Sequence, residues 1–130
     1  MTTFRLTICV VLALALLTST GVAVQRPDSL QAGKADLKSA GALTFGPDGL
    51  LFVGDSIGGM IFALDTQDRS PSQAGSLEVA GLSEKIAAMA GTTADQIQVN
   101  DVAVNPVSHK TYVSVSRGLG PAAEPLIVRI

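Results

Sequence analysis

The strongest constraint on this fold is the spacing of turn residues between short apolar runs. The runs "ALTF", "LLFVGD" and "MIFALD" are separated by "GPDG" (46–49) and "SIGG" (56–59). Proline at the second position and glycine at the fourth suit a type I turn, and paired glycines favour a tight reversal. The pattern predicts three antiparallel strands at 42–45, 50–54 and 60–64. Because the runs are apolar on both faces, we expect both faces of this sheet to be covered.

The same pattern returns about 60 residues later, a spacing within reach of a structural repeat. "ALTFGPDGLLFVGDS" can be set over "DVAVNPVSHKTYVSVS" with one inserted residue, and "MIFAL" (60–64) over "LIVRI" (126–130). The aligned pairs are Phe45 with Val104, Pro47 with Pro106, Phe52 with Tyr112, Val53 with Val113, and Ser56 with Ser116. Strand, turn, strand, turn and strand recur in order, which predicts two units of one repeat.

The region between the two units has its own signals. "SLEVAGL" (76–82) is predicted as a fourth strand. "SEKIAAMAG" (83–91) is predicted as a short helix, because Ser83 suits an N-cap and Gly91 a C-terminal stop. A further short turn is expected at 93–96.

The first 23 residues are typical of a secretory signal peptide. One cation, Arg5, precedes an apolar run of about 12 residues, and small residues follow it. The alternative is an uncleaved anchor, because the apolar part nearly reaches the length of a membrane span. We expect cleavage, a linker over 24–39, and a secreted or periplasmic protein. The only cysteine, Cys9, lies within the predicted signal, so the mature chain would have no disulfide.

Composition limits the partners. The chain has a formal net charge of −2 and no tryptophan. A mildly acidic protein offers no surface for a polyanion, so we expect no nucleic-acid partner. No phosphate-binding loop or nucleotide fingerprint is present, and a structural zinc site would need more histidine or cysteine than the mature chain has. We expect no cofactor, and either a protein or a small molecule as partner.

The stretch "ALTFGPDGLLFVGDSIGGMIFALD" resembles a blade of secreted NHL-type and SMP-30/gluconolactonase-like β-propellers. "VNDVAVNP" (99–106) is similar to the start of a blade in the lactonase group. The resemblance implies an all-β domain over 40–130, built of antiparallel meander blades of a partial β-propeller with one short inserted helix. Blade one would span about 40–82, the helical insert 83–97, and blade two 98–130. Two blades do not close a propeller, so we expect an N-terminal piece of a longer protein.

The same resemblance supplies one candidate site residue, Asn100, which it implies faces a central channel. Asp101, next to Asn100, and Asp55 are further candidates for binding. The leading expectation is a binding or scaffold module. The alternative is a lactonase-like hydrolase that uses a divalent metal, with Asn100 near the metal.

A second enzymatic alternative starts from "LLFVGDSIGG". A strand followed by Gly-Asp-Ser resembles the nucleophile block of GDSL-type esterases, with Ser56 as nucleophile. Such a serine needs a general base and a helix directly after it. The only histidine is His109, and the glycines after Ser56 oppose a helix. The sequence therefore favours a turn between two strands at Ser56.

Overall fold

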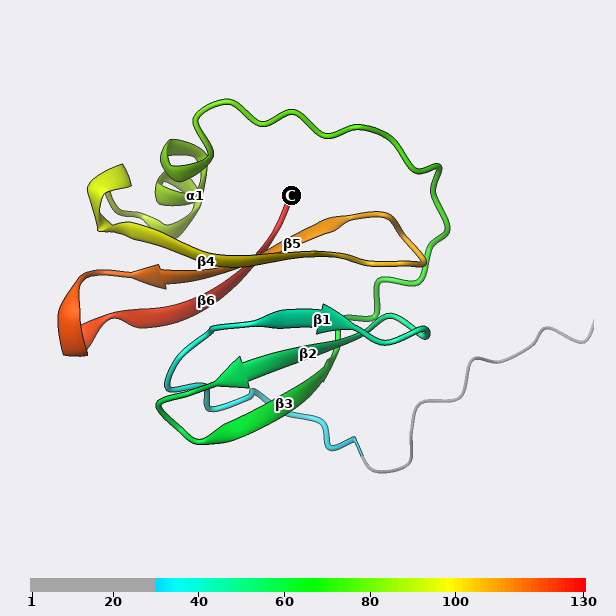
Figure 1. Ribbon diagram of the computed structural model, residues 1–130, viewed down its shortest axis with the longest axis horizontal. Coiled ribbons are helices and arrows are strands. Elements are labelled where there is room, and N and C mark those ends of the chain that lie inside the picture. Colours follow the sequence, from blue (N-terminus) through cyan, green and yellow to red (C-terminus); the bar gives the residue numbers. More distant parts are fainter. Residues whose placement is uncertain (1–29) are drawn as a thin grey trace, which may run out of the picture. The chain divides into compact units, whose positions relative to one another are not determined.

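The computed structural model describes residues 30–130. The predicted signal peptide (1–23) and residues 24–29 of the predicted linker lie outside the described residues. Within 30–130 the chain is mostly β, with two three-stranded antiparallel sheets and one short helix (Figure 1).

Sheet A is formed by the first repeat. It contains β1 (Leu43–Phe45), β2 (Leu50–Asp55) and β3 (Met60–Asp65), in the order β1-β2-β3. Residues 56–59 form a turn, as the paired glycines predicted. The three predicted strands are confirmed to within one residue at each end.

Sheet B is formed by the second repeat. It contains β4 (Ile97–Val104), β5 (Thr111–Arg117) and β6 (Glu124–Arg129), in the order β4-β5-β6. A β-bulge between Val99 and Asp101 interrupts the pairing of β4 with β5. A short 3-10 helix, η2 (Gly120–Ala122), precedes β6.

The two sheets pair in the register that the aligned sequences predict. Leu43 lies opposite Val53 in sheet A, and the aligned residues Val102 and Val113 lie opposite each other in sheet B. Val53 likewise pairs with Phe62, while Val113 pairs with Val128. The internal repeat is therefore present in the strand pairing as well as in the sequence.

The region between the repeats differs in part from its prediction. The fourth strand predicted at 76–82 is wrong, because residues 66–79 contain no strand. The helix is confirmed as α1 (Leu82–Ala90), but Gly81, in a left-handed conformation with φ 63°, takes the N-cap position predicted for Ser83. Gly91, with φ 67°, ends the helix as predicted, and η1 (Ala94–Gln96) forms the predicted turn.

Two hydrophobic clusters hold the layers together. The first lies between the sheets and contains Leu43, Leu51 and Val53 from sheet A with Tyr112 from sheet B. The second lies on the other face of sheet B, where Val113, Val115 and Val128 pack against Ile86 of α1. Sheet B is thus covered by sheet A on one face and partly by α1 on the other, where Val102 and Val104 of β4 stay more than half exposed. In Figure 1 the segment that leads into α1 also crosses this second face.

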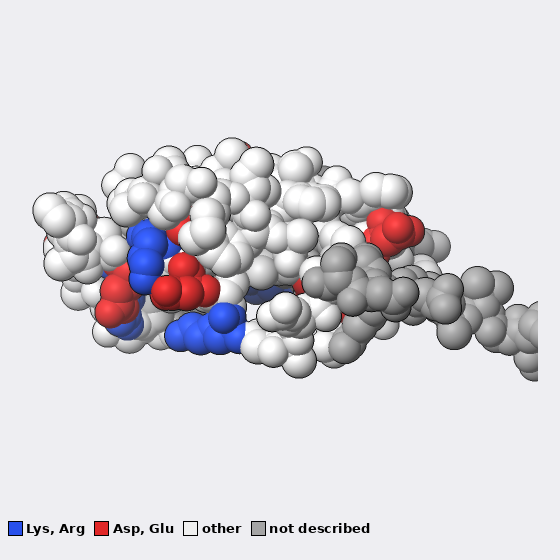
Figure 2. Space-filling view, turned by 90° about the horizontal axis from the view of Figure 1, so that it is seen from below, with Lys and Arg blue, Asp and Glu red and all other residues white. Residues whose placement is uncertain are grey.

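Sheet A has one face that residues 30–130 leave largely open, contrary to the expectation that both faces are covered. Cross-strand pairing places the following residues on this open face: Thr44, Leu50, Phe52, Gly54, Ile61, Ala63 and Asp65. The Ile61 side chain is 78% exposed. Figure 2 shows the molecule from below the view of Figure 1, and most of the described surface in that view is uncharged.

No helix within residues 30–130 has the length and apolarity that a membrane span requires.

The inter-sheet core gives a direct test of this packing. Val53 is fully buried, whereas Val102 on β4 is 57% exposed. We expect Val53→Ala to lower the free energy of unfolding by about 2–3 kcal/mol, because it removes buried methyl groups and leaves a cavity. Val102→Ala should cost about 1 kcal/mol or less. Urea unfolding of both variants measures the difference, and equal losses would contradict the packing described here.

Candidate functional site

Asp55, one of the predicted site residues, lies at the end of β2 with its carboxylate buried. Its Oδ1 atom accepts hydrogen bonds from the Ser39 N–H (2.9 Å), the Ser39 hydroxyl (2.7 Å) and the Gly58 N–H (2.8 Å). Its Oδ2 atom accepts a hydrogen bond from the Lys38 N–H at 2.8 Å. The carboxylate therefore connects the segment before β1 to the turn between β2 and β3. A Cβ atom at Gly58 would lie 2.5 Å from Asp55 Oδ2, so the turn requires glycine there.

These contacts set the ionisation of Asp55. Burial alone would raise its pKa, but the N–H groups of Lys38 and Gly58 and both donors of Ser39 lower the pKa from the ordinary 3.8 to about 2. Asp55 is therefore charged at neutral pH and saturated with donors from its own chain.

Asn100 and Asp101 lie at the bulge in β4, and both bind the backbone that leads into β1. The Asn100 side-chain amide donates to the Ala40 carbonyl at 2.7 Å and to the Ser116 hydroxyl at 3.0 Å. Asp101 Oδ2 accepts the Leu43 N–H at 2.8 Å, and its Oδ1 accepts the Val102 N–H at 2.8 Å. The N–H groups of Leu43 and Val102 lower the pKa of Asp101.

The three predicted site residues thus converge on one stretch of chain, residues 38–43. Asp55 binds its first part from within the first repeat, whereas Asn100 and Asp101 bind its second part from the second repeat. The amide donors of Asn100 and both carboxylates are engaged with the protein itself. The arrangement connects the two repeats.

The structure does not bring the two residues of the esterase alternative into contact. Ser56 lies in a turn rather than at the start of a helix, and its hydroxyl is 3.4 Å from the Ser39 hydroxyl. His109 instead contacts the Ser72 carbonyl through its Nδ1 atom. No catalytic pair forms between Ser56 and His109 in the part of the chain that the structure describes.

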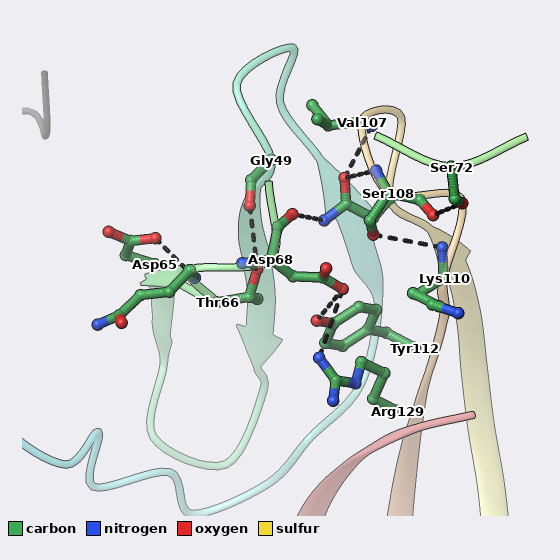
Figure 3. A network of polar contacts seen from close by, with 12 residues as sticks. Gly49, Asp65, Thr66, Asp68, Ser72, Val107, Ser108, Lys110, Tyr112 and Arg129 are labelled. Atoms are coloured by element: carbon green, nitrogen blue, oxygen red, sulfur yellow. Dashed lines mark hydrogen bonds and ion pairs between the residues drawn. The ribbon is translucent and has the colours of Figure 1, made fainter. Parts of the chain in front are cut away.

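A second polar network, which the sequence did not reveal, centres on Asp68 (Figure 3). The Tyr112 hydroxyl donates to Asp68 Oδ2 at 2.9 Å, and Arg129 Nη1 lies 3.7 Å from the same oxygen. The Asn105 amide donates to the Asp68 carbonyl at 2.8 Å, while Asn105 Oδ1 accepts the Val107 N–H at 2.8 Å. The network joins the chain after β3 to the β4–β5 turn.

Part of this network has a local signal. Asn105 precedes Pro106, and an asparagine before proline favours a turn in which the side chain accepts nearby N–H groups. The hydrogen bond from Asn105 to Asp68 has no such signal in the sequence. The two residues are 37 positions apart, and their proximity depends on the packing of the repeats.

A groove in the described chain lies between residues 72–82 and the face of sheet B opposite sheet A. It has a volume of about 750 Å³, and its walls include Leu77, Val79, Val102 and Val104, with Lys110 among the lining residues. An apolar groove of this size can hold part of a small molecule.

Metal binding has no candidate cluster in the described chain. Residues 30–130 contain no group of three or more His, Cys, Asp or Glu side chains placed to hold an ion.

Comparison with known proteins adds no relative. No protein-family model matches the chain, and neither curated proteins nor solved structures give a match.

The Asp55 contacts predict a dependence of stability on acid. A carboxylate whose pKa is lower in the folded than in the unfolded protein stabilises the fold above the unfolded pKa, and this stabilisation is lost as the pH falls through the folded pKa. We therefore expect the Asp55 contribution to be present above about pH 4 and to disappear toward pH 2. Asp55→Asn should be less stable at neutral pH and show a flatter decline of unfolding free energy across this window.

Ser39→Ala provides a graded comparison, because it removes one of the four hydrogen bonds to Asp55 and should give a smaller effect of the same sign. The stability of the wild type and of both variants is measured by thermal unfolding from pH 7 to the acid end of this window. Parallel profiles for the wild type and Asp55→Asn would contradict the assignment.

Proposed function

We propose that this chain is an exported binding or scaffold module made of two β-propeller-type blades. The blade interpretation is supported by the two meanders of three strands, which share one register and stack face to face. Export is supported by the signal-like first 23 residues of the sequence.

The two sheets stack through faces that are not equivalent in the repeat, and this supports a binding role. Sheet A contacts sheet B through the face that carries Val53, whereas sheet B contacts sheet A through the face that carries Tyr112. Tyr112, Ser114 and Ile127 lie on the contacting face of sheet B, and their aligned partners in sheet A are Phe52, Gly54 and Ile61. The open face of sheet A therefore repeats a face that is already used for packing.

The exposure of this face is the observation that carries the proposal. Tyr112 is 6% exposed in its contact with sheet A, whereas Ile61 on the open face is 78% exposed. The charged residue on this face, Asp65, lies at its end, is ion-paired with Arg69 and has a side chain that is 11% exposed. A largely apolar sheet face favours a protein partner that offers a sheet face of its own.

The candidate polar residues support binding over catalysis. Asn100 and Asp101 bind the first repeat from the second, Asp55 binds residues 38 and 39 within the first repeat, and Ser56 lacks a base among the described residues. The mildly acidic charge favours a protein over a polyanion as partner. We therefore propose recognition through the open face of sheet A, outside the cell or in the periplasm.

Site-specific photocrosslinking tests this proposal. A photoreactive phenylalanine analogue replaces Thr44 on the open face, or Lys85 on α1 as the matched exposed control, in the full chain expressed in its native host. We expect the Thr44 position alone to capture one protein, which is identified, purified and titrated against the chain. Thr44→Glu should weaken that binding by about tenfold or more, because a charge would be buried at the interface.

Lys85→Glu should leave the same affinity unchanged. Equal weakening by both substitutions, or no capture at Thr44, would contradict recognition through the open face.

A further inference from the structure

The two sheets have four outermost strands, and each of these has backbone groups that could pair with another chain. Proteins usually block such pairing with charges, proline, bulges or covering groups. The strands are β1 and β3 in sheet A and β4 and β6 in sheet B. Three of the four carry a recognisable block.

The β1 and β4 edges block each other. The Asp101 carboxylate takes the outward N–H of Leu43, and Asn100 donates to the carbonyl of Ala40 just before β1. β4 itself is interrupted by the bulge between Val99 and Asp101. A bulge twists an edge away from regular pairing.

The β6 edge is blocked by its composition. β6 contains Pro125, which has no N–H to donate, and it begins with Glu124 and ends with Arg129. The Arg129 side chain is 58% exposed. Charges and proline on an edge strand are among the devices that protect it against pairing.

Within residues 30–130, residues 60–64 of the β3 edge have none of these devices. Its sequence "MIFALD" has no proline and no charge before Asp65, and its pairing with β2 runs without a bulge from Met60 to Asp65. The Asp65 carboxylate forms an ion pair with Arg69 at 2.7 Å. Within residues 30–130, no hydrogen bond joins the outer edge of residues 60–64 to another segment. Met60 is 50% exposed.

We propose that the free edge of β3 pairs antiparallel with β3 of a second copy of this chain, so that two A sheets join into one six-stranded sheet. Opposite residues in an antiparallel pair have their side chains on the same face of the sheet. In a two-fold symmetric pair, one residue of the strand must therefore lie directly opposite the same residue of the second copy. An axis at Phe62 places Met60 opposite Leu64 and Ile61 opposite Ala63. An axis at Ala63 would instead place Asp65 opposite Ile61.

The register centred on Phe62 is therefore the one we assign. It pairs only uncharged residues and places two aromatic rings opposite each other, which favours an antiparallel pair. The strand is its own complement in this register, which is why a second copy of the chain is the partner. The pairing uses the edge of sheet A and stands whether or not the open face of sheet A binds another protein.

Oligomeric state tests the pairing. The full chain, expressed from Met1 and purified in the form that accumulates, is measured by size exclusion with light scattering over a dilution series. We expect a dimer for the wild type. The double variant Ile61→Lys/Ala63→Lys should raise the dimer dissociation constant by about tenfold or more, because edge lysines oppose pairing. Both replaced residues are exposed, so the fold should tolerate them.

Two control variants separate this edge from other surfaces. Val102→Lys changes an exposed residue of β4, and Thr44→Glu changes the open face on β1; both should remain dimeric. A monomeric wild type, or a dimer that survives the two edge lysines, overturns the proposal. Loss of the dimer in Thr44→Glu also overturns it, since association would then use the open face.

Disulfide trapping tests the register. In a Cys9→Ser background, Phe62→Cys should crosslink faster on oxidation than Ile61→Cys or Ala63→Cys. Only residue 62 lies directly opposite its own copy, at the Cβ separation of about 4.5–5.5 Å that neighbouring strands allow. Fastest crosslinking at residue 63 would overturn the assigned register.

Discussion

The structure depends on the contact between the backbone leading into β1 and the side chains of sheet B. Three side chains reach this backbone: Asn100 binds the Ala40 carbonyl, Ser114 binds the Gly41 carbonyl at 2.7 Å, and Asp101 binds the Leu43 N–H. Ala40 and Leu43 are buried in the inter-sheet core, so unpaired backbone groups here would each cost about 1–3 kcal/mol. The polar contacts therefore allow the apolar contact between the sheets to form.

This contact is directional, and the direction explains why the two repeats have different surroundings. In each repeat, one face of the sheet carries the residue aligned with Tyr112 and the other face carries the residue aligned with Val53. The fold packs the Val53 face of sheet A against the Tyr112 face of sheet B. An interface of unlike faces leaves one face of each kind over, in contrast to a symmetric interface that uses the same face twice. Val113, Val115 and Val128 on the remaining face of sheet B are buried against Ile86 of α1, whereas residues 30–130 leave the remaining face of sheet A largely open. The two sheets differ in this way because α1 belongs to the segment that connects the repeats.

Local chemistry made much of the fold predictable from the sequence. The turns at Pro47 and Pro106, the glycines after Ser56 and the stop at Gly91 each fix the backbone through their own conformational limits. The roles of the site residues were not predictable in this way. Asn100 and Asp101 lie at a strand start in the sequence, but their partners are about 60 residues away and are defined only when the sheets pack. The same holds for Asp68 and Tyr112, which are 44 positions apart.

The missing fourth strand shows how such distant contacts override local preference. Residues 76–82 have the composition of a strand and would have to turn back along β3 to form one. Instead, Asp68 is bound by Asn105 and Tyr112, and the Ser72 hydroxyl donates to the Ser108 carbonyl, so that the chain is joined to the β4–β5 turn directly after sheet A. From that point it continues along sheet B and into α1 (Figure 1). The polar network around Asp68 therefore directs the chain over sheet B, and within residues 30–130 no further strand pairs with residues 60–64 of β3.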